Sequence, residues 1–309
     1  MLKKWLAAAM AAVLAFSLSG AYAVEKTVVT SFYPIYILAK NLTYNIEGLT
    51  LKNLAAPETG CLHDYQLLTG DMRTLSGAKV LLINGAGMES YLDTVIAQFP
   101  EMAIVDASNH VPLMENDGGD EHLHENESET QDHAHEDNAH IWLSVSNAIL
   151  MVSNLRDGLM AAYPEYTELL TTNTDAYIAR LTALDEELKT GLASLAGKEI
   201  ITFHEAFPYF AKAYGLNVAA VVVREPGEAL SPAQLAELVK TVRGLGVPPL
   251  FTEPQYPDLA ARTLAAETGA KVYTLDPLVT GPMDEGALTA YEEGMRKNLQ
   301  TLQLALGGN

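Results

Sequence analysis

The sequence predicts an α/β protein with two parallel-sheet lobes, one long rigid helix joining them, and a metal site in the cleft between the lobes. Short apolar segments alternate with helical segments in both halves of the chain, which indicates parallel strands with crossover helices. Between the halves, an uninterrupted helical pattern runs from Pro164 to about Leu195. All eight histidines fall outside the interiors of the expected helices and strands.

Residues 1–23 have the pattern of a secretory signal peptide. Lys3 and Lys4 precede an apolar run that ends near Leu18, and Ala21-Tyr22-Ala23 has the small-x-small form that signal peptidase recognises. The run is shorter than the ~20 apolar residues of a membrane-spanning helix. No cysteine stands at the cleavage point. We therefore expect a periplasmic or otherwise extracytoplasmic protein without a lipid anchor.

The first lobe is expected to span residues 24–163. Its strands are expected at residues 26–30, 49–54, 79–83 and 103–105, and its helices at residues 35–42, 64–76 and 88–98. A further helix is expected to begin near Ser146 and to be interrupted at Tyr163-Pro164.

Within this lobe, residues 110–139 are rich in histidine, acidic residues, asparagine and glycine, and almost nothing apolar follows Met114. Such a segment cannot bury enough surface to order itself, so we expect a mobile loop. It holds five histidines: His110, His122, His124, His133 and His135. Those at two-residue spacing could gather Zn²⁺ weakly, whereas tracts of this kind are also often simply solvated.

The linking helix is expected over residues 164–196. Pro164 suits the first turn of a helix, and no glycine interrupts the pattern before Gly191. Apolar residues recur at spacings of three and four: Leu169, Leu170, Ala176, Tyr177, Leu181, Leu184 and Leu188. At 1.5 Å per residue such a helix is roughly 45 Å long, which suits a strut across two lobes.

The second lobe is expected to span residues 197–309 and to repeat the alternation of the first. Its strands are expected at residues 199–203, 218–223, 249–252 and 271–274, and its helices at residues 207–214, 232–245, 258–268 and 286–306.

The charge and the cysteine count exclude some functions. The formal charge is −20, and removing Lys3 and Lys4 with the signal peptide makes it −22. Nucleic-acid binding depends on lysine and arginine, so this balance argues against nucleic acid as a partner. The single cysteine, Cys61, excludes an intrachain disulfide.

Three histidines outside the loop stand where an expected strand ends or a loop meets a helix. His63 follows the second strand, His140 closes the histidine-rich loop, and His204 follows the first strand of the second lobe. Ligand sites in open α/β sheets form at the carboxyl ends of strands, so a cleft between lobes would bring these side chains together. Three neutral imidazoles and one oxygen make a tetrahedral shell suited to Zn²⁺.

Asp276 is our choice for the oxygen ligand, because it follows the strand expected at residues 271–274. Water or Glu205 is the alternative, and an aspartate before Pro277 can instead form a turn or cap a helix. Glu89, Glu253 and Trp142 are expected to be structural, as are Tyr209 and Phe210.

Eight fragments occur in an order that resembles a known family: VVTSFYPIYILAKNL, GCLHDYQLLTGD, LLINGAGMESYLD, AHIWLS, FHEAFPYFAKAYGL, LSPAQL, FTEPQYP and TLDPL. The family is the metal-specific solute-binding proteins of ABC transporters, cluster A-I, and specifically its zinc branch. The resemblance covers nearly the whole mature chain. It implies two four-stranded lobes bridged by a rigid helix.

The resemblance also implies the metal, the ligands and the partner. His63, His140 and His204 would bind Zn²⁺, which would be the transported ligand and not a catalytic cofactor. Manganese members carry glutamate at the position of His204, so the third imidazole points to zinc. The partner would be an ABC permease dimer in the membrane, and we expect the chain to act as a monomer. A histidine-rich acidic loop is typical of the zinc branch.

The chain departs from the family pattern beside two of these ligands. Cys61-Leu62 replaces an Asp-Pro pair, so Cys61 could lie near the metal, although a buried inert thiol is the commoner case. Ala139 and Ser144 stand where the family has proline and aspartate around His140, which alters the groups that support this imidazole.

Two other functions remain as alternatives. A zinc buffer or a metal-dependent adhesin would use the same site without transport. A zinc hydrolase would need an open water position and a general base, for which Glu205 beside His204 is the available residue. No substrate-binding motif supports hydrolysis, so we do not expect an enzyme.

Overall fold

The computed structural model describes residues 26–59, 62, 65–115, 137–222 and 231–307. The expected signal peptide at residues 1–23 lies outside these ranges. No helix within them is both long and apolar enough to cross a bilayer.

The first lobe is built on a parallel four-stranded sheet in the order β2-β1-β3-β4. Its strands are β1 (Lys26–Thr30), β2 (Leu49–Asn53), β3 (Val80–Ile83) and β4 (Ala103–Asp106). Its helices are α2 (Tyr33–Leu42), α3 (Thr69–Ser76), the 3₁₀ turn Ser90–Leu92 and α4 (Asp93–Ile96). Parallel pairing requires each strand to return through a crossover, which the helices supply.

The second lobe repeats this plan in the order β6-β5-β7-β8. Its strands are β5 (Glu199–Thr202), β6 (Asn217–Val221), β7 (Leu250–Thr252) and β8 (Val272–Thr274). Its helices are α7 (Pro208–Tyr214), α8 (Pro232–Gly244) and α9 (Leu259–Thr268). In both sheets the strand order reverses beside the first strand, the position at which open α/β sheets bind ligands.

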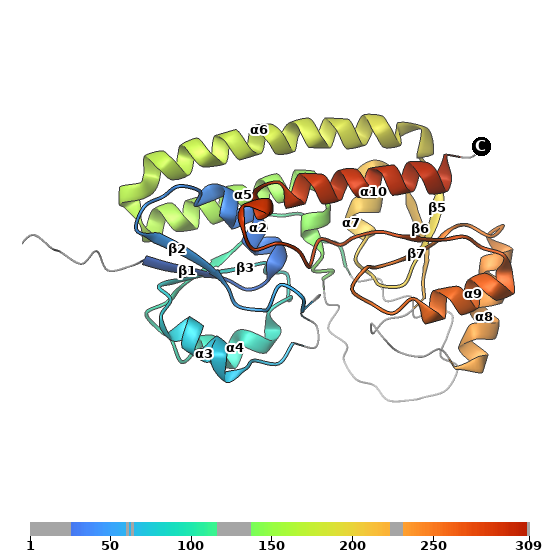
Figure 1. Cartoon of the computed structure of the whole chain (residues 1–309), viewed down its shortest axis with the longest axis horizontal. Helices are drawn as coiled ribbons and strands as arrows, with labels where there is room; N and C mark the ends of the chain where they lie inside the picture. The colour runs from blue at the N-terminus through green and yellow to red at the C-terminus, as the bar shows by residue number, and fades with distance from the viewer. Residues whose placement is uncertain (1–25, 60–61, 63–64, 116–136, 223–230, 308–309) are drawn as a thin grey trace, which may run out of the picture.

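A layer of long helices spans both lobes (Figure 1). It contains α5 (Val145–Ala162), α6 (Thr167–Leu192) and α10 (Ala290–Leu306). The 26 residues of α6 give a helix about 39 Å long. Short 3₁₀ turns, Pro164–Tyr166 and Ala193–Leu195, flank α6 and complete the expected linking segment.

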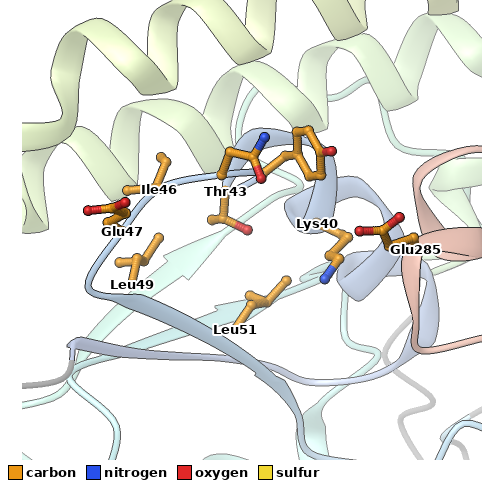
Figure 2. Close-up of a pocket in the computed structure, with 9 residues that line it drawn as sticks. Lys40, Thr43, Ile46, Glu47, Leu49, Leu51 and Glu285 are labelled. Atoms are coloured by element: carbon orange, nitrogen blue, oxygen red, sulfur yellow. The ribbon is translucent and has the colours of Figure 1, made fainter.

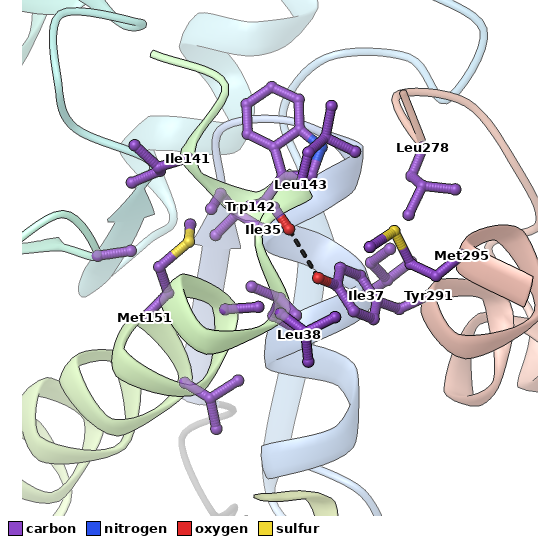
Figure 3. Packing of buried hydrophobic residues seen from close by; sticks show 14 of the residues in the cluster. Ile35, Ile37, Leu38, Ile141, Trp142, Leu143, Met151, Leu278, Tyr291 and Met295 are labelled. Carbon is purple, nitrogen blue, oxygen red and sulfur yellow. Dashed lines mark hydrogen bonds between the residues drawn. The ribbon is translucent and has the colours of Figure 1, made fainter. Parts of the chain in front are cut away.

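One hydrophobic cluster joins the two lobes. The Trp142 side chain is fully buried, and its indole Nε1–H donates to the Pro277 carbonyl oxygen over 2.7 Å. The hydroxyl of Tyr291 on α10 donates to the Trp142 carbonyl oxygen, also over 2.7 Å (Figure 3). Trp142 therefore has the structural role expected for it, and the lobes share a core.

Two expected helices of the first lobe are shorter than their sequence pattern. The helix expected at residues 64–76 begins at Thr69, because the Asp71 carboxylate accepts hydrogen bonds from the Leu68 N–H and the Tyr65 hydroxyl before the first turn. The helix expected at residues 88–98 is divided into a 3₁₀ turn and α4.

The ends of the histidine-rich segment at residues 110–139 are more ordered than its composition suggests. Val111, Asn138 and Ala139 are buried. The Asn138 N–H donates to the Met114 carbonyl oxygen over 2.8 Å, and Glu115 and Asp137 form an isolated antiparallel bridge. These backbone contacts compensate for the scarcity of apolar side chains.

Candidate metal centre

Two of the predicted histidine ligands, His140 and His204, come from different lobes and meet in the interior. His204 lies two residues beyond β5, the strand beside which the second sheet reverses its order. His140 precedes the 3₁₀ turn Ile141–Leu143, which leads into α5. Each side chain is only 1% exposed, so both imidazoles are sheltered from bulk water.

The geometry of this pair suits a shared ion. Their Nε2 atoms are 3.0 Å apart, and their ring planes are inclined at 81° with centroids 4.8 Å apart. Two imidazoles on a tetrahedral Zn²⁺, with Zn–N distances of about 2.0–2.1 Å, would place their nitrogens about 3.3 Å apart. A small outward movement of the two rings would therefore admit the ion between them.

The His140 ring is oriented by Asn138, which the motif analysis did not single out. Asn138 Oδ1 lies 2.9 Å from the His140 backbone nitrogen and 3.2 Å from Nδ1 of its ring. The Asn138 Nδ2 donates to the Glu205 carbonyl oxygen over 2.8 Å. One side chain thus contacts the residue next to His204 and the His140 ring at the same time.

Asp276 is held at the end of β8 by its own turn and by α10. Its Oδ1 accepts from the Leu278 N–H over 2.8 Å, so the turn that was the alternative to ligation is present. The Asn298 side chain contacts both the N–H and the carbonyl oxygen of Asp276, at 2.8 and 2.7 Å. Burial raises the pKa of the Asp276 carboxyl, while the Leu278 N–H and Lys297 oppose this shift.

Glu253 is a second carboxyl at the same edge of the sheet, and it is buried whereas Asp276 is half-buried. The register pairs Thr202 with Phe251, so His204 and Glu253 each lie two residues beyond the same step of adjacent parallel strands. The Glu253 side chain is 4% exposed, and its Oε1 has no hydrogen-bond partner among the described residues. Burial raises its pKa to about 8; the Gln255 amide lowers the value and nearby Asp276 raises it.

Other predicted residues have the following positions. His110 is exposed in the turn after β4, at a φ of 60°. Glu205 is half-buried in the turn after His204. Tyr209 and Phe210 are buried in the core, as expected, and the Tyr209 hydroxyl also accepts from the Met114 N–H and donates to the Asn138 carbonyl oxygen.

Several predicted ligands lie outside the described residues: Cys61, His63, His122, His124, His133 and His135. Among the residues that are described, no three histidine, cysteine, aspartate or glutamate side chains are grouped closely enough to hold an ion. The described part of the centre is therefore the His140–His204 pair. Glu253 and Asp276 follow β7 and β8, but neither is grouped with the two histidines closely enough to complete an ion site.

A separate surface cavity lies on the first lobe beside α2 and β2 (Figure 2). It has a volume of about 430 Å³, and Lys40, Glu47 and Glu285 supply its charged groups. No histidine lines it, so its chemistry differs from that of the His140–His204 pair.

Comparisons with known proteins identify the family. The family model described as "Zinc-uptake complex component A periplasmic" matches residues 28–305. The zinc-binding protein AdcA of Streptococcus pyogenes serotype M3 is 32% identical over 289 residues, covering 90% of this chain and 55% of that protein. The high-affinity zinc uptake system protein ZnuA of Bacillus subtilis is 29% identical and is covered over 87% of its length.

A solved structure agrees with these relatives. The Zn(II)-bound ZnuA-like domain of Streptococcus pneumoniae AdcA superposes with a TM-score of 0.75 at 27% identity, covering 92% of this chain and all of that domain. The chain spans about half the length of the AdcA relatives that it matches. The family model covers most of the sequence, so this chain belongs to the periplasmic zinc-uptake complex component A family.

Proposed function

We propose that this chain captures Zn²⁺ outside the cytoplasmic membrane and delivers it to an ABC import permease. The observation that carries the proposal is the His140–His204 pair, in which two buried imidazoles from different lobes face each other with their Nε2 atoms 3.0 Å apart. Two neutral imidazoles provide the nitrogen donors that Zn²⁺ favours. The zinc-binding and zinc-uptake relatives support the same ligand.

His63 is our proposed third ligand and Asp276 our proposed fourth, with water, Glu205 or Cys61 as the substitutes for the fourth. Asp276 supports this assignment because, within the described part of the chain, only its Oδ1 accepts a hydrogen bond, from the Leu278 N–H. The chemistry is that of a carrier: zinc is the cargo, and zinc-dependent hydrolysis of ester or peptide substrates would contradict the proposal.

We further propose an exported, monomeric protein divided into lobes at residues 24–163 and 197–309, with residues 164–196 linking them. The extracytoplasmic location is supported by the periplasmic description of the family. The histidines His110, His122, His124, His133 and His135 would form a weak auxiliary collector of zinc near the tight site.

The test is a zinc titration of the metal-free protein in the presence of competing Mn²⁺, repeated with His204→Ala. We expect one tight zinc site that Mn²⁺ displaces poorly, and a loss of affinity greater than about 100-fold in His204→Ala, beyond what removal of an outer-shell partner costs. Zinc binding that His204→Ala leaves intact would contradict the proposal. A deletion strain that grows normally under zinc starvation would favour a buffer or an adhesin.

A further inference from the structure

We infer that Asn138 is a positioning residue that fixes the tautomer of His140 and ties the His140 segment to the His204 segment. The inference rests on the proposed function for its meaning, because it concerns how the two imidazoles are presented to zinc. The Asn138 side chain is 2% exposed, and both of its polar atoms, Oδ1 and Nδ2, form hydrogen bonds.

The orientation of the Asn138 amide follows from partners whose roles are fixed. A backbone N–H can only donate, so the atom 2.9 Å from the His140 backbone nitrogen has to be Oδ1. A backbone carbonyl can only accept, so the atom 2.8 Å from the Glu205 oxygen has to be Nδ2. Both assignments agree, and they leave a single orientation of the amide.

This orientation determines which His140 nitrogen carries the hydrogen. Oδ1 of Asn138 also faces the His140 Nδ1 at 3.2 Å, and an amide oxygen can only accept. The neutral His140 ring therefore carries its hydrogen on Nδ1 and has its Nε2 lone pair directed at His204. A ligating imidazole is held in the same way, with one nitrogen on the metal and the other donating to an oxygen.

The Asn138 backbone is fixed as firmly as its side chain. Its N–H donates to the Met114 carbonyl oxygen over 2.8 Å, and its carbonyl oxygen accepts from the Tyr209 hydroxyl over 2.9 Å. Tyr209 belongs to α7 of the second lobe. Asn138 thus receives support from the lobe that carries His204 while it orients His140.

The amide is better suited to this position than a carboxylate or an apolar side chain. Aspartate could accept from both groups of His140, but it would place an oxygen opposite the Glu205 carbonyl oxygen, with no hydrogen to share. Alanine would lose every side-chain contact and leave the Glu205 carbonyl without this donor. Only the amide both accepts from His140 and donates to the segment that follows His204.

The experiment is ¹⁵N–¹H correlation of the His140 ring in the metal-free full chain at pH 8, where neutral imidazole dominates. We expect wild-type protein to carry the hydrogen on Nδ1, Asn138→Asp to keep it there, and Asn138→Ala to show a mixture of tautomers. A hydrogen on Nε2 in the wild type, its loss from Nδ1 in Asn138→Asp, or an unchanged ring in Asn138→Ala would overturn the inference. A hydrogen on Nε2 in the wild type overturns the inference even if a variant fails to fold.

Zinc titration of the same proteins adds a second readout. We expect Asn138→Ala to weaken zinc binding by about 10–100-fold, the usual effect of losing an outer-shell partner. The control is Asn173→Asp, which removes a side-chain amide that donates to the Leu42 and Tyr44 carbonyl oxygens on the first lobe, and it should leave affinity and ring tautomer unchanged. If wild-type protein binds no zinc, the proposed function fails, whereas the ring tautomer still decides the role of Asn138.

Discussion

Beside the two buried imidazoles of His140 and His204, two carboxyls follow the strands next to β5: buried Glu253, level with His204 on the adjacent strand, and half-buried Asp276. Burial raises the pKa values of Glu253 and Asp276, which favours their protonated forms. A nearby cation would oppose this shift and favour the ionised carboxylates. The imidazoles have to be neutral to bind zinc, and affinity should therefore fall as the pH drops through the histidine pKa near ~6.5.

Glu253 should impose a pH dependence on the stability of the metal-free protein. Its pKa is about 8 in the folded state against 4.5 for the free side chain, so the folded state holds this proton more tightly. The free energy of unfolding should then be highest below pH 4.5 and should fall as the pH rises from 4.5 to about 8. The Glu253→Gln variant lacks this loss because its side chain stays neutral.

Thermal unfolding after chelation measures this effect. Between pH 5 and pH 8.5, we expect Glu253→Gln to gain at least about 1 kcal/mol relative to wild type, or about 2–4 °C in Tm. Glu293→Gln, on the exposed face of α10, is the control and should show no such trend. A wild type whose Tm follows the same pH curve as Glu253→Gln would contradict the role of burial.

Asp276→Asn tests the proposed oxygen ligand without removing its turn. The new side chain can still accept from the Leu278 N–H, but it is a poorer donor to zinc. We expect at least about a tenfold loss of zinc affinity, the lower bound for an outer-shell partner. Asp284→Asn is a matched control, because exposed Asp284 makes the same kind of bond to the Gly286 N–H. Equal affinities would assign the fourth position to water, Glu205 or Cys61.

Among the elements, α2, α6 and α10 are held together by one arginine. Arg180 on α6 donates from Nε to Glu292 on α10 over 2.9 Å and contacts the Asn41 side chain on α2. Glu292 is 5% exposed, and its Oε2 has no partner among the described residues. Arg180 therefore supplies the charge that balances a buried carboxylate where the helix layer crosses the lobes.

Arg180→Ala should destabilise this helix layer. Breaking a fully buried ion pair costs about 3–5 kcal/mol, and because the Arg180 side chain is half exposed we expect about 2 kcal/mol. Arg296→Ala removes the exposed pair with Glu187 on the same helices and should cost at most about 1 kcal/mol. Urea unfolding measures the loss of unfolding free energy in each variant. Equal losses would mean that the Arg180–Glu292 pair stabilises the protein no more than the exposed Arg296–Glu187 pair.

Regular elements were predictable from sequence because each follows a local pattern. Every strand and long helix lies within a few residues of its expected position, including α6, whose buried face is formed by Leu181, Leu184 and Leu188. The division of residues 88–98 and the late start of α3 were not predictable, because they depend on contacts such as the Asp71 cap and not on periodicity.

The site was only partly predictable, because some of its residues are placed by contacts between distant segments and not by a local pattern. His204 was singled out because it follows a parallel strand, and His140 because it closes the histidine-rich loop. The structure brings the two rings together, and their binding of zinc stays a prediction. Asn138 lies two residues before His140, but its role depends on the Glu205 carbonyl oxygen, and no local pattern reveals that contact. Glu253 was expected to be structural, and this stays a prediction; the strand register, which a local pattern does not reveal, places it level with His204.

At the scale of the whole molecule, the lobes are joined by a shared core as well as by α6. The hydrogen bonds from Trp142 to Pro277 and from Tyr291 to Trp142 cross between them. Figure 3 shows the second of these bonds. Tyr33 and Tyr36 on α2 also donate to the Pro282 and Met283 carbonyl oxygens of the segment that leads into α10. We therefore expect zinc release to involve small shifts of the lobes and not a wide hinge opening.

We expect that residues 116–136 of the histidine-rich segment can be removed without disturbing the residues at its base. Glu115 and Asp137 already pair in antiparallel fashion, so replacing residues 116–136 with Asn-Gly should close a tight hairpin. We expect this variant to bind fewer zinc ions in total while its tight site keeps the wild-type affinity, since Asn138 remains in place. Isothermal titration measures both quantities, and an unchanged stoichiometry would refute the collector role.

Zinc-edge anomalous diffraction from crystals of the zinc-loaded protein tests the central claim most directly. We predict one strong peak between the His140 and His204 rings, about 2.0–2.1 Å from the Nε2 atoms of both. A principal zinc ion bound elsewhere, or held by only one of these two imidazoles, would contradict a site shared between the lobes.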